Sequence, residues 1–213
     1  MQRAEILASI CQLITEGRLG DARTSLLTEY PSAKATTSRK PWSKARLVRV
    51  FLRDGFTDRY FGERLVFPGT LRALSIVLTE AFPYHPNWKQ SATHPAFYEL
   101  YPTIDHIFPA ARGGADYESN VVTTSMLRNS AKANWLLEEL GWSLDLAPIA
   151  PGWDGLVGWF RSAWIAHEAL HHDVAVRQWH QALSEASSPS EPPSSTAIAS
   201  QRVQQRAQRP ESS

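Results

Sequence analysis

The stretch IDHIFPAARGGADYESNVVTTSMLRNSAKANW, residues 104–135, decides how this chain is interpreted. An Asp-His pair, Asp105-His106, ends a short apolar-rich segment, and a proline and two glycines then mark a turn. A β-branched run at residues 121–124 comes next, and polar residues with helical spacing follow it. This order predicts a strand, a loop, a second strand and a helix.

Polar side chains in this stretch suit metal-assisted hydrolysis. If the helix packs on the hairpin, Asp105, His106 and Asn129 come into one neighbourhood. Asp and Asn present hard oxygen ligands that suit Mg²⁺ better than zinc, and an imidazole beside such an ion can take a proton from water. A hard cation and a general base are together what phosphodiester hydrolysis needs. Lys132 shares the helix face of Asn129, and we expect it to contact a phosphate.

This arrangement resembles the HNH endonuclease family, whose catalytic motif folds as a ββα-metal finger. Together with RVFLRDGFTDRYFG upstream, the resemblance covers roughly half the chain. It implies that His106 is the general base and that Asp105 and Asn129 hold the divalent cation, Mg²⁺ or Mn²⁺. It also implies that Asn120 holds the loop bearing the histidine, and that the last position of the motif is Asn129 in place of a histidine. The implied activity is metal-dependent cleavage of DNA, with double-stranded DNA as the expected partner.

The chain departs from the family pattern at two expected zinc knuckles. Many similar proteins carry two Cys-x-x-Cys pairs that hold a structural zinc, whereas the matching positions here are Asp58 and Phe61, then Ser125 and Arg128. The only cysteine is Cys11, so we expect no structural zinc and no intramolecular disulfide. Because a structural zinc contributes folding energy directly, something must replace it. We expect Phe61 to fill the space with apolar contacts, and Asp58 and Arg128 to form an ion pair.

The charge of the chain is informative only locally. With 22 basic and 21 acidic residues the net charge is +1, which indicates no partner. Residues 34–53, however, carry several lysines and arginines and no acid, which is typical either of a nucleic-acid contact or of a solvated helix face. The residues expected to contact the DNA backbone are Arg46, Arg49, Arg53, Arg112 and Lys132.

The remaining pattern predicts an α+β protein in which a small ββα-metal finger is embedded among helices. No signal-peptide core and no run of membrane-spanning length is found, so we expect a soluble, cytoplasmic protein without a membrane partner. The expected units are an N-terminal helical extension at 1–40, the nuclease domain at 41–145, tryptophan-rich helices at 146–186 and a disordered tail at 187–213. Within them, periodicity predicts helices at 3–16, 43–54, 69–82 and 125–141, one or two helices at 155–180, and a small hairpin at 56–67.

Two other functional interpretations stay open. The first is a finger that has lost activity and only binds nucleic acid, because the loss of the zinc positions shows that this chain has diverged. The second comes from HEALH, residues 167–171, which matches the helical zinc site of many metalloproteases. Val174 and Arg177 stand where the extended protease motif needs Gly and His, so the alternative is an amphipathic helix with histidines at its polar edge.

A long aromatic loop precedes the Asp-His pair. Its Trp88 and Tyr98 can either stack on bases or pack the loop onto the domain. Loops of this length in compact domains are often functional.

Overall fold

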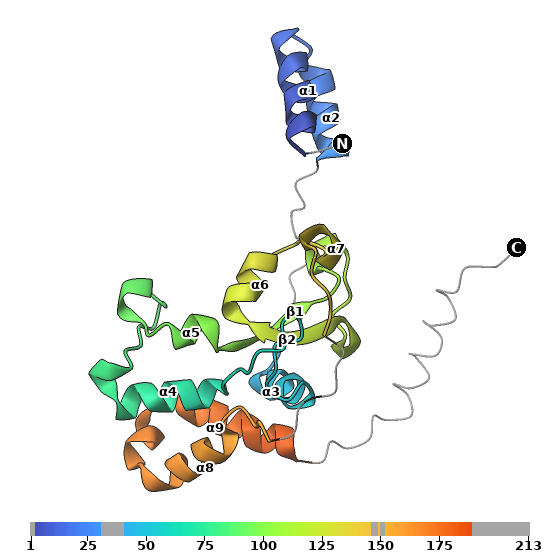
Figure 1. Cartoon of the computed structure of the whole chain (residues 1–213). Helices are drawn as coiled ribbons and strands as arrows, with labels where there is room; N and C mark the ends of the chain where they lie inside the picture. The colour runs from blue at the N-terminus through green and yellow to red at the C-terminus, as the bar shows by residue number, and fades with distance from the viewer. Residues whose placement is uncertain (1–2, 31–40, 146–148, 150–151, 189–213) are drawn as a thin grey trace, which may run out of the picture.

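The computed structural model of the chain describes residues 3–30, 41–145, 149 and 152–188. These residues form helices and one two-stranded antiparallel sheet, so the α+β class is confirmed (Figure 1). Two expected features fall on other parts of the chain: the basic residues at 34, 39 and 40, and the tail beyond residue 188. No helix among the described residues combines the length and the apolar character needed to cross a bilayer.

The elements occur in the order that the sequence predicts around the decisive stretch. The strands are β1 (Pro102–His106) and β2 (Val121–Ser125). The helices are α1 (Arg3–Thr15), α2 (Leu19–Glu29), α3 (Lys44–Arg53), α4 (Pro68–Val77), α5 (Ala96–Glu99), α6 (Met126–Lys132), α7 (Leu137–Leu140), α8 (Val157–Ala166) and α9 (Val174–Ser187).

The strands and α6 form a ββα unit that positions the candidate site. β1 pairs antiparallel with β2 in a register that runs from Pro102 opposite Ser125 to His106 opposite Val121. Ser125 ends the second strand and caps α6, because its hydroxyl accepts a hydrogen bond from the Arg128 amide at 3.2 Å. Both α6 and α3 contact the two strands, and Figure 1 shows them on opposite sides of the hairpin.

Local chemistry explains the start of α3. The hydroxyl of Ser43 accepts a hydrogen bond from the Arg46 amide at 3.2 Å, which satisfies one of the free amides at the helix start. The helix ends before Asp54-Gly55, and Gly55 has a φ of +58°. Both helix boundaries agree with the prediction of a helix over residues 43–54.

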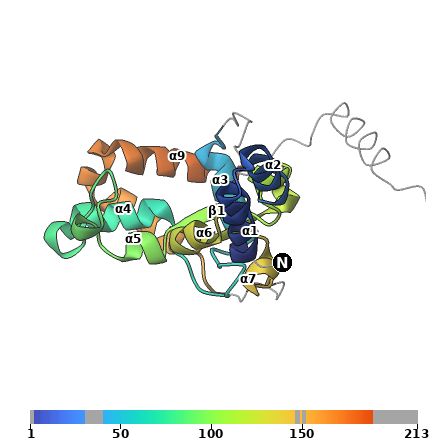
Figure 2. The ribbon, with the colours of Figure 1, turned by 90° about the horizontal axis from the view of Figure 1, so that it is seen from above.

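One hydrophobic core joins helices from both sides of the predicted boundary at residue 145. Phe67 is fully buried, with its ring centroid 5.1 Å from that of Phe160 and 5.9 Å from that of Trp179. Val48 and Phe51 of α3 belong to the same cluster. Figure 2 shows α9 running alongside α4 toward α3, and α9 contacts both. The C-terminal helices therefore complete the core of the segment that carries the ββα unit.

Two predicted elements differ from the structure, and a third is decided between two alternatives. The helix predicted over 125–141 is broken, because α6 ends at Lys132 and Ala133 takes a φ of +46°. Of the one or two helices predicted over 155–180, the structure has two, α8 and α9, separated by His167 in extended backbone and a short 3₁₀ turn. The hairpin predicted over 56–67 is reduced to a single antiparallel bridge between Thr57 and Arg64.

Candidate functional site

Asp105 lies buried in a polar cluster beside α6. Its Oδ2 is 2.8 Å from the ammonium nitrogen of Lys132 and accepts a hydrogen bond from the Tyr60 hydroxyl at 2.6 Å. Burial, and then the negative charge of Asp105, raises the pKa of Tyr60 far above its ordinary value, so the phenol stays protonated and donates. Asp105 is thus held by two donors on one oxygen.

Lys132 is fully buried, with none of its surface exposed. Its ammonium also donates to the backbone carbonyl of His106 at 2.8 Å, and so joins the end of α6 to the end of β1. The expected contact between Lys132 and a phosphate is therefore wrong, since a buried ammonium already paired with a carboxylate cannot reach a ligand at the surface.

Asn129 lies on the same helix one turn before Lys132 and faces the first strand. Its side-chain Nδ2 donates to the Thr103 hydroxyl at 3.0 Å and to the Ile104 carbonyl at 3.2 Å. These bonds fix the amide so that its nitrogen faces the strand. Of the three side chains predicted to share one neighbourhood, Asp105 and Asn129 both lie where α6 meets β1, whereas the ring of His106 contacts Asp116 of the loop instead.

His106 turns away from α6 and toward the loop between the strands. Its Nε2 lies 3.0 Å from Oδ1 of Asp116. The other carboxylate oxygen, Oδ2, accepts a hydrogen bond from the indole of Trp42 at 2.8 Å. Burial alone raises the pKa of Asp116, but the bonds from Trp42 and His106 and the nearby charge of Arg46 outweigh it, so this pKa lies below its ordinary value.

Asn120 clamps the loop that follows His106. Its amide oxygen accepts from the Phe108 amide at 3.0 Å, and its Nδ2 donates to the carbonyls of Phe108 at 3.1 Å and Ala115 at 2.9 Å. The Ile107 amide also donates to the Asn120 carbonyl at 2.9 Å. Asn120 therefore closes the base of the loop that begins directly after His106.

The arginines predicted to contact DNA serve largely to hold the same loop. Arg46 donates to the carbonyl of Asp116 at 3.2 Å, and Arg53 donates to the carbonyls of Glu118 at 2.7 Å and Val121 at 2.8 Å. Arg112, in the loop between the two strands, was also predicted to contact DNA, and it pairs with Glu139 at 2.7 Å. Arg49 lies between Arg46 and Arg53 in α3 and is exposed.

The oxygens of Asp105 and Asn129 are the candidate ligands for a small divalent cation. Within the parts of the chain that the structure describes, no three His, Cys, Asp or Glu side chains converge on a possible metal position. Oδ1 of Asp105 and the side-chain oxygen of Asn129 accept no hydrogen bond from the described residues. Two hard oxygens fit Mg²⁺ or Mn²⁺, which usually keeps several waters and takes few protein ligands. The ammonium of Lys132 opposes such an ion by Coulomb repulsion.

The positions of the two missing zinc knuckles are joined by Asp58. Its Oδ2 lies 3.3 Å from Nη1 of Arg128, so the predicted ion pair is confirmed. Phe61 does not fill a buried space, because it is 50% exposed. Its ring packs edge-on against Trp142, with a centroid distance of 5.0 Å, and lies beneath the Arg128 guanidinium at 4.4 Å. The absence of zinc itself stays a prediction.

The HEALH segment does not form the helical face that a zinc protease needs. Residues Glu168–His172 are a 3₁₀ turn, and His167 lies in extended backbone before it. His171 packs on Trp164, with a ring distance of 4.1 Å, and its Nε2 lies 2.7 Å from the Trp164 carbonyl. Here the histidine completes local packing.

The aromatic loop before β1 packs onto itself and onto the domain. Trp88 makes edge contacts with Phe97, Tyr98 and Tyr101, and the Tyr98 hydroxyl donates to the Trp88 carbonyl. Of the two alternatives for these aromatic residues, packing is the one found.

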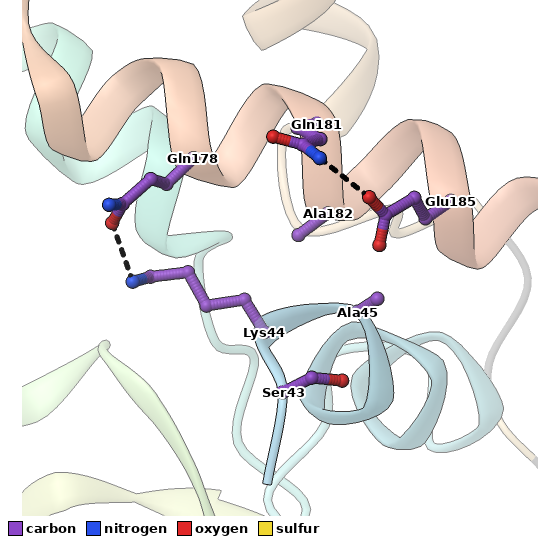
Figure 3. Close-up of a pocket in the computed structure, with 7 residues that line it drawn as sticks. All are labelled: Ser43, Lys44, Ala45, Gln178, Gln181, Ala182 and Glu185. Carbon is purple, nitrogen blue, oxygen red and sulfur yellow. Dashed lines mark hydrogen bonds between the residues drawn. The ribbon is translucent and has the colours of Figure 1, made fainter.

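A pocket of about 190 Å³ lies between the start of α3 and α9 (Figure 3). Lys44 donates to Gln178 across it at 2.8 Å, and Gln181 donates to Glu185 at 2.8 Å. The polar side chains that line this pocket satisfy one another, so they require no ligand.

Sequence reasoning missed three residues of the candidate site: Trp42, Tyr60 and Asp116. Asp116 carried one usable signal, because an acid in the loop between the two strands lies within reach of a histidine at the end of the first. Trp42 and Tyr60 come from outside the motif, and nothing in their spacing links them to it.

Comparisons with protein-family models, with curated proteins and with solved structures found no match to this chain.

Proposed function

We propose that this chain is an HNH-type endonuclease that hydrolyses phosphodiester bonds in DNA with the help of a divalent cation. The observation that carries the proposal is the clamp made by Asn120. It closes the loop directly after His106, the role that the middle residue of the motif would have, in a ββα unit where Asp105 and Asn129 come together.

In this proposal His106 accepts the proton of the attacking water. Asp116 holds the imidazole ring, and Asn120 keeps the chain after His106 in a fixed path. Asp105 and Asn129 would hold the cation through their oxygens. When bound, the cation offsets negative charge on the phosphate and on the leaving oxygen. Arg49 is exposed on α3, and we assign it a contact with the DNA backbone.

A catalytically inactive protein that binds nucleic acid is the second candidate. The specific observation in its favour is the ion pair between Asp105 and Lys132, which places a positive charge beside the proposed cation ligand. Such a protein would bind DNA in a salt-dependent way without cleaving it.

The test is cleavage of supercoiled plasmid by the purified full chain in Mg²⁺ or Mn²⁺, with EDTA as a metal control. We expect His106→Ala to lower the cleavage rate roughly 10²- to 10⁴-fold, the usual contribution of a general base. His167→Ala is the matched control, because His167 is exposed and lies outside the ββα unit. It should cleave like the unmodified chain.

Three outcomes separate the candidates. Metal-dependent cleavage that His106→Ala abolishes supports the nuclease. Cleavage that survives His106→Ala overturns it. Absence of cleavage, with DNA binding that weakens steeply as salt rises, supports the inactive binding protein.

A further inference from the structure

The loop between the two strands brings an acid to the proposed general base. Asp116 lies ten residues after His106 in the sequence, and its Oδ1 is 3.0 Å from Nε2 of that histidine. The His106 side chain is 20% exposed and that of Asp116 is 35% exposed, so the contact lies at the edge of the surface.

Asp116 is itself held from the start of α3. The indole of Trp42 donates to Oδ2 at 2.8 Å, and a guanidinium nitrogen of Arg46 donates to the Asp116 carbonyl at 3.2 Å. The Arg46 guanidinium also lies over the Trp42 ring, 3.4 Å from its centroid. Both carboxylate oxygens and the backbone of Asp116 are thus engaged, and the carboxylate has one orientation toward His106.

An ionised carboxylate only accepts hydrogen bonds, so the ring nitrogen that faces it must carry a proton. The pKa of Asp116 lies below its ordinary value, which keeps the group ionised at neutral pH. The neutral imidazole therefore carries its proton on Nε2 and its lone pair on Nδ1.

We propose that Asp116 is the positioning residue of this site: it fixes the ring of His106 in one orientation and in the tautomer that has its lone pair on Nδ1. Trp42 and Arg46 hold Asp116 in place for this purpose. The catalytic role of Asp116 rests on the proposed nuclease function. The tautomer and the orientation of the His106 ring do not depend on that function.

The proposal is tested on the full chain by nitrogen-15 NMR of the imidazole rings at about pH 8.5, two units above the reference pKa of histidine. His106 is assigned by the signal missing in His106→Ala. We expect a protected Nε2–H signal for His106 in the unmodified chain. Asp116→Ala should lose that protected proton. Asp116→Asn should lose it as well, because the Trp42 indole holds the amide oxygen, so that the amide nitrogen faces His106 and favours the tautomer with its proton on Nδ1.

Cleavage kinetics are the second readout. We expect Asp116→Ala to lower kcat roughly 10- to 100-fold with little change in KM, as for other residues that orient a reacting histidine. Asp116→Asn should lower kcat at least as far, because it favours the tautomer that has its proton on Nδ1. Tyr117→Phe is the matched control, because Tyr117 is the next residue in the same loop and is 58% exposed. It should leave both readouts unchanged.

The outcomes distinguish this proposal from the proposed function. An unaltered His106 signal in Asp116→Ala, or a proton found on Nδ1 in the unmodified chain, overturns the positioning role. A lost Nε2–H signal in Asp116→Ala supports that role even if the chain cleaves no DNA, in which case only the nuclease proposal fails.

Discussion

At the scale of single residues, Asp58 joins two turns that are far apart in the sequence. Its Oδ1 accepts from the backbone amides of Tyr60 at 2.9 Å and Phe61 at 3.2 Å, which belong to its own turn. Its Oδ2 accepts from the Thr124 hydroxyl at 2.8 Å and the Ser125 amide at 2.9 Å, which belong to the other turn. The Asp58 side chain is fully buried. Its negative charge is therefore balanced by protein donors, five in number among the described residues when Arg128 is counted.

We expect Asp58→Ala to lower the free energy of unfolding by about 3–5 kcal/mol, the usual effect of removing one partner from a buried charged pair. Four protein donors besides Arg128 also lose their acceptor. Urea unfolding followed by circular dichroism measures this change. Glu63→Ala is the control, because Glu63 pairs with the same arginine at 2.6 Å but is 59% exposed. That variant should lose less than about 1 kcal/mol, and equal losses would contradict the special position of Asp58.

At the scale of elements, one aspartate joins two helices that are far apart in the sequence. Asp173 caps α9, because its Oδ1 accepts from the Val176 amide at 2.9 Å. Its Oδ2 lies 2.5 Å from Nη2 of Arg72, which comes from α4. The same carboxylate thus starts α9 and fixes it against its neighbour.

This contact predicts a dependence of stability on pH. Burial alone raises the pKa of Asp173, but the Arg72 guanidinium and the Val176 amide outweigh it and hold the pKa below its ordinary value. The stabilisation is therefore complete above the unfolded pKa of about 3.9 and is lost as the pH falls through the lower folded pKa. Asp173→Asn should lower the free energy of unfolding by about 1–2 kcal/mol near pH 7 and by much less near pH 2.

Urea unfolding at several pH values measures the effect. Asp154→Asn is the control, because Asp154 is exposed and accepts from the Gly158 amide at 2.7 Å with no arginine bound to it among the described residues. A loss in Asp173→Asn that stays constant from neutral to acid pH would show that the ion pair with Arg72 contributes nothing.

At the scale of the whole molecule, the ββα unit depends on a core that is built mainly elsewhere. α3 contacts the hairpin on one side and α9 on the other, and its Val48 and Phe51 are buried in the cluster that contains Phe160 and Trp179. The site residues Trp42 and Arg46 lie at the beginning of that same helix. Packing of the C-terminal helices therefore supports the geometry around His106.

Phe160→Ala should lower the free energy of unfolding by about 3–5 kcal/mol, since it leaves a cavity against Phe67 in a fully buried position. Because the core is shared, we expect the backbone signal and the His106 imidazole signal to change in one transition. Ile165→Ala on the same helix is the control, because Ile165 is 84% exposed and its loss should cost less than about 0.5 kcal/mol. A C-terminal transition separate from that of His106 would contradict the shared core.

The sequence by itself determined the features that depend on near neighbours. The alternation and the turn between residues 104 and 125 predicted the two strands, and Ser43 and Ser125 stand where α3 and α6 are capped. Such features follow from propensity, capping and periodicity within a few residues. The pairing of the distant residues Asp58 and Arg128 was also predicted, but from the resemblance to a known family and not from the local sequence.

Only the tertiary structure decided which charges meet. Lys132 has the spacing of a surface residue on α6, yet it is buried, with its ammonium held by the Asp105 carboxylate and by the His106 carbonyl of β1. Arg46 and Arg53 look like a basic surface in the sequence, but packing of α3 against the loop turns them toward its carbonyls. Asp116 meets His106 because the loop folds back under the Asn120 clamp. Apart from the placement of Asp116 in the loop after His106, the sequence carries no signal for these contacts, because their proximity follows from how the elements pack.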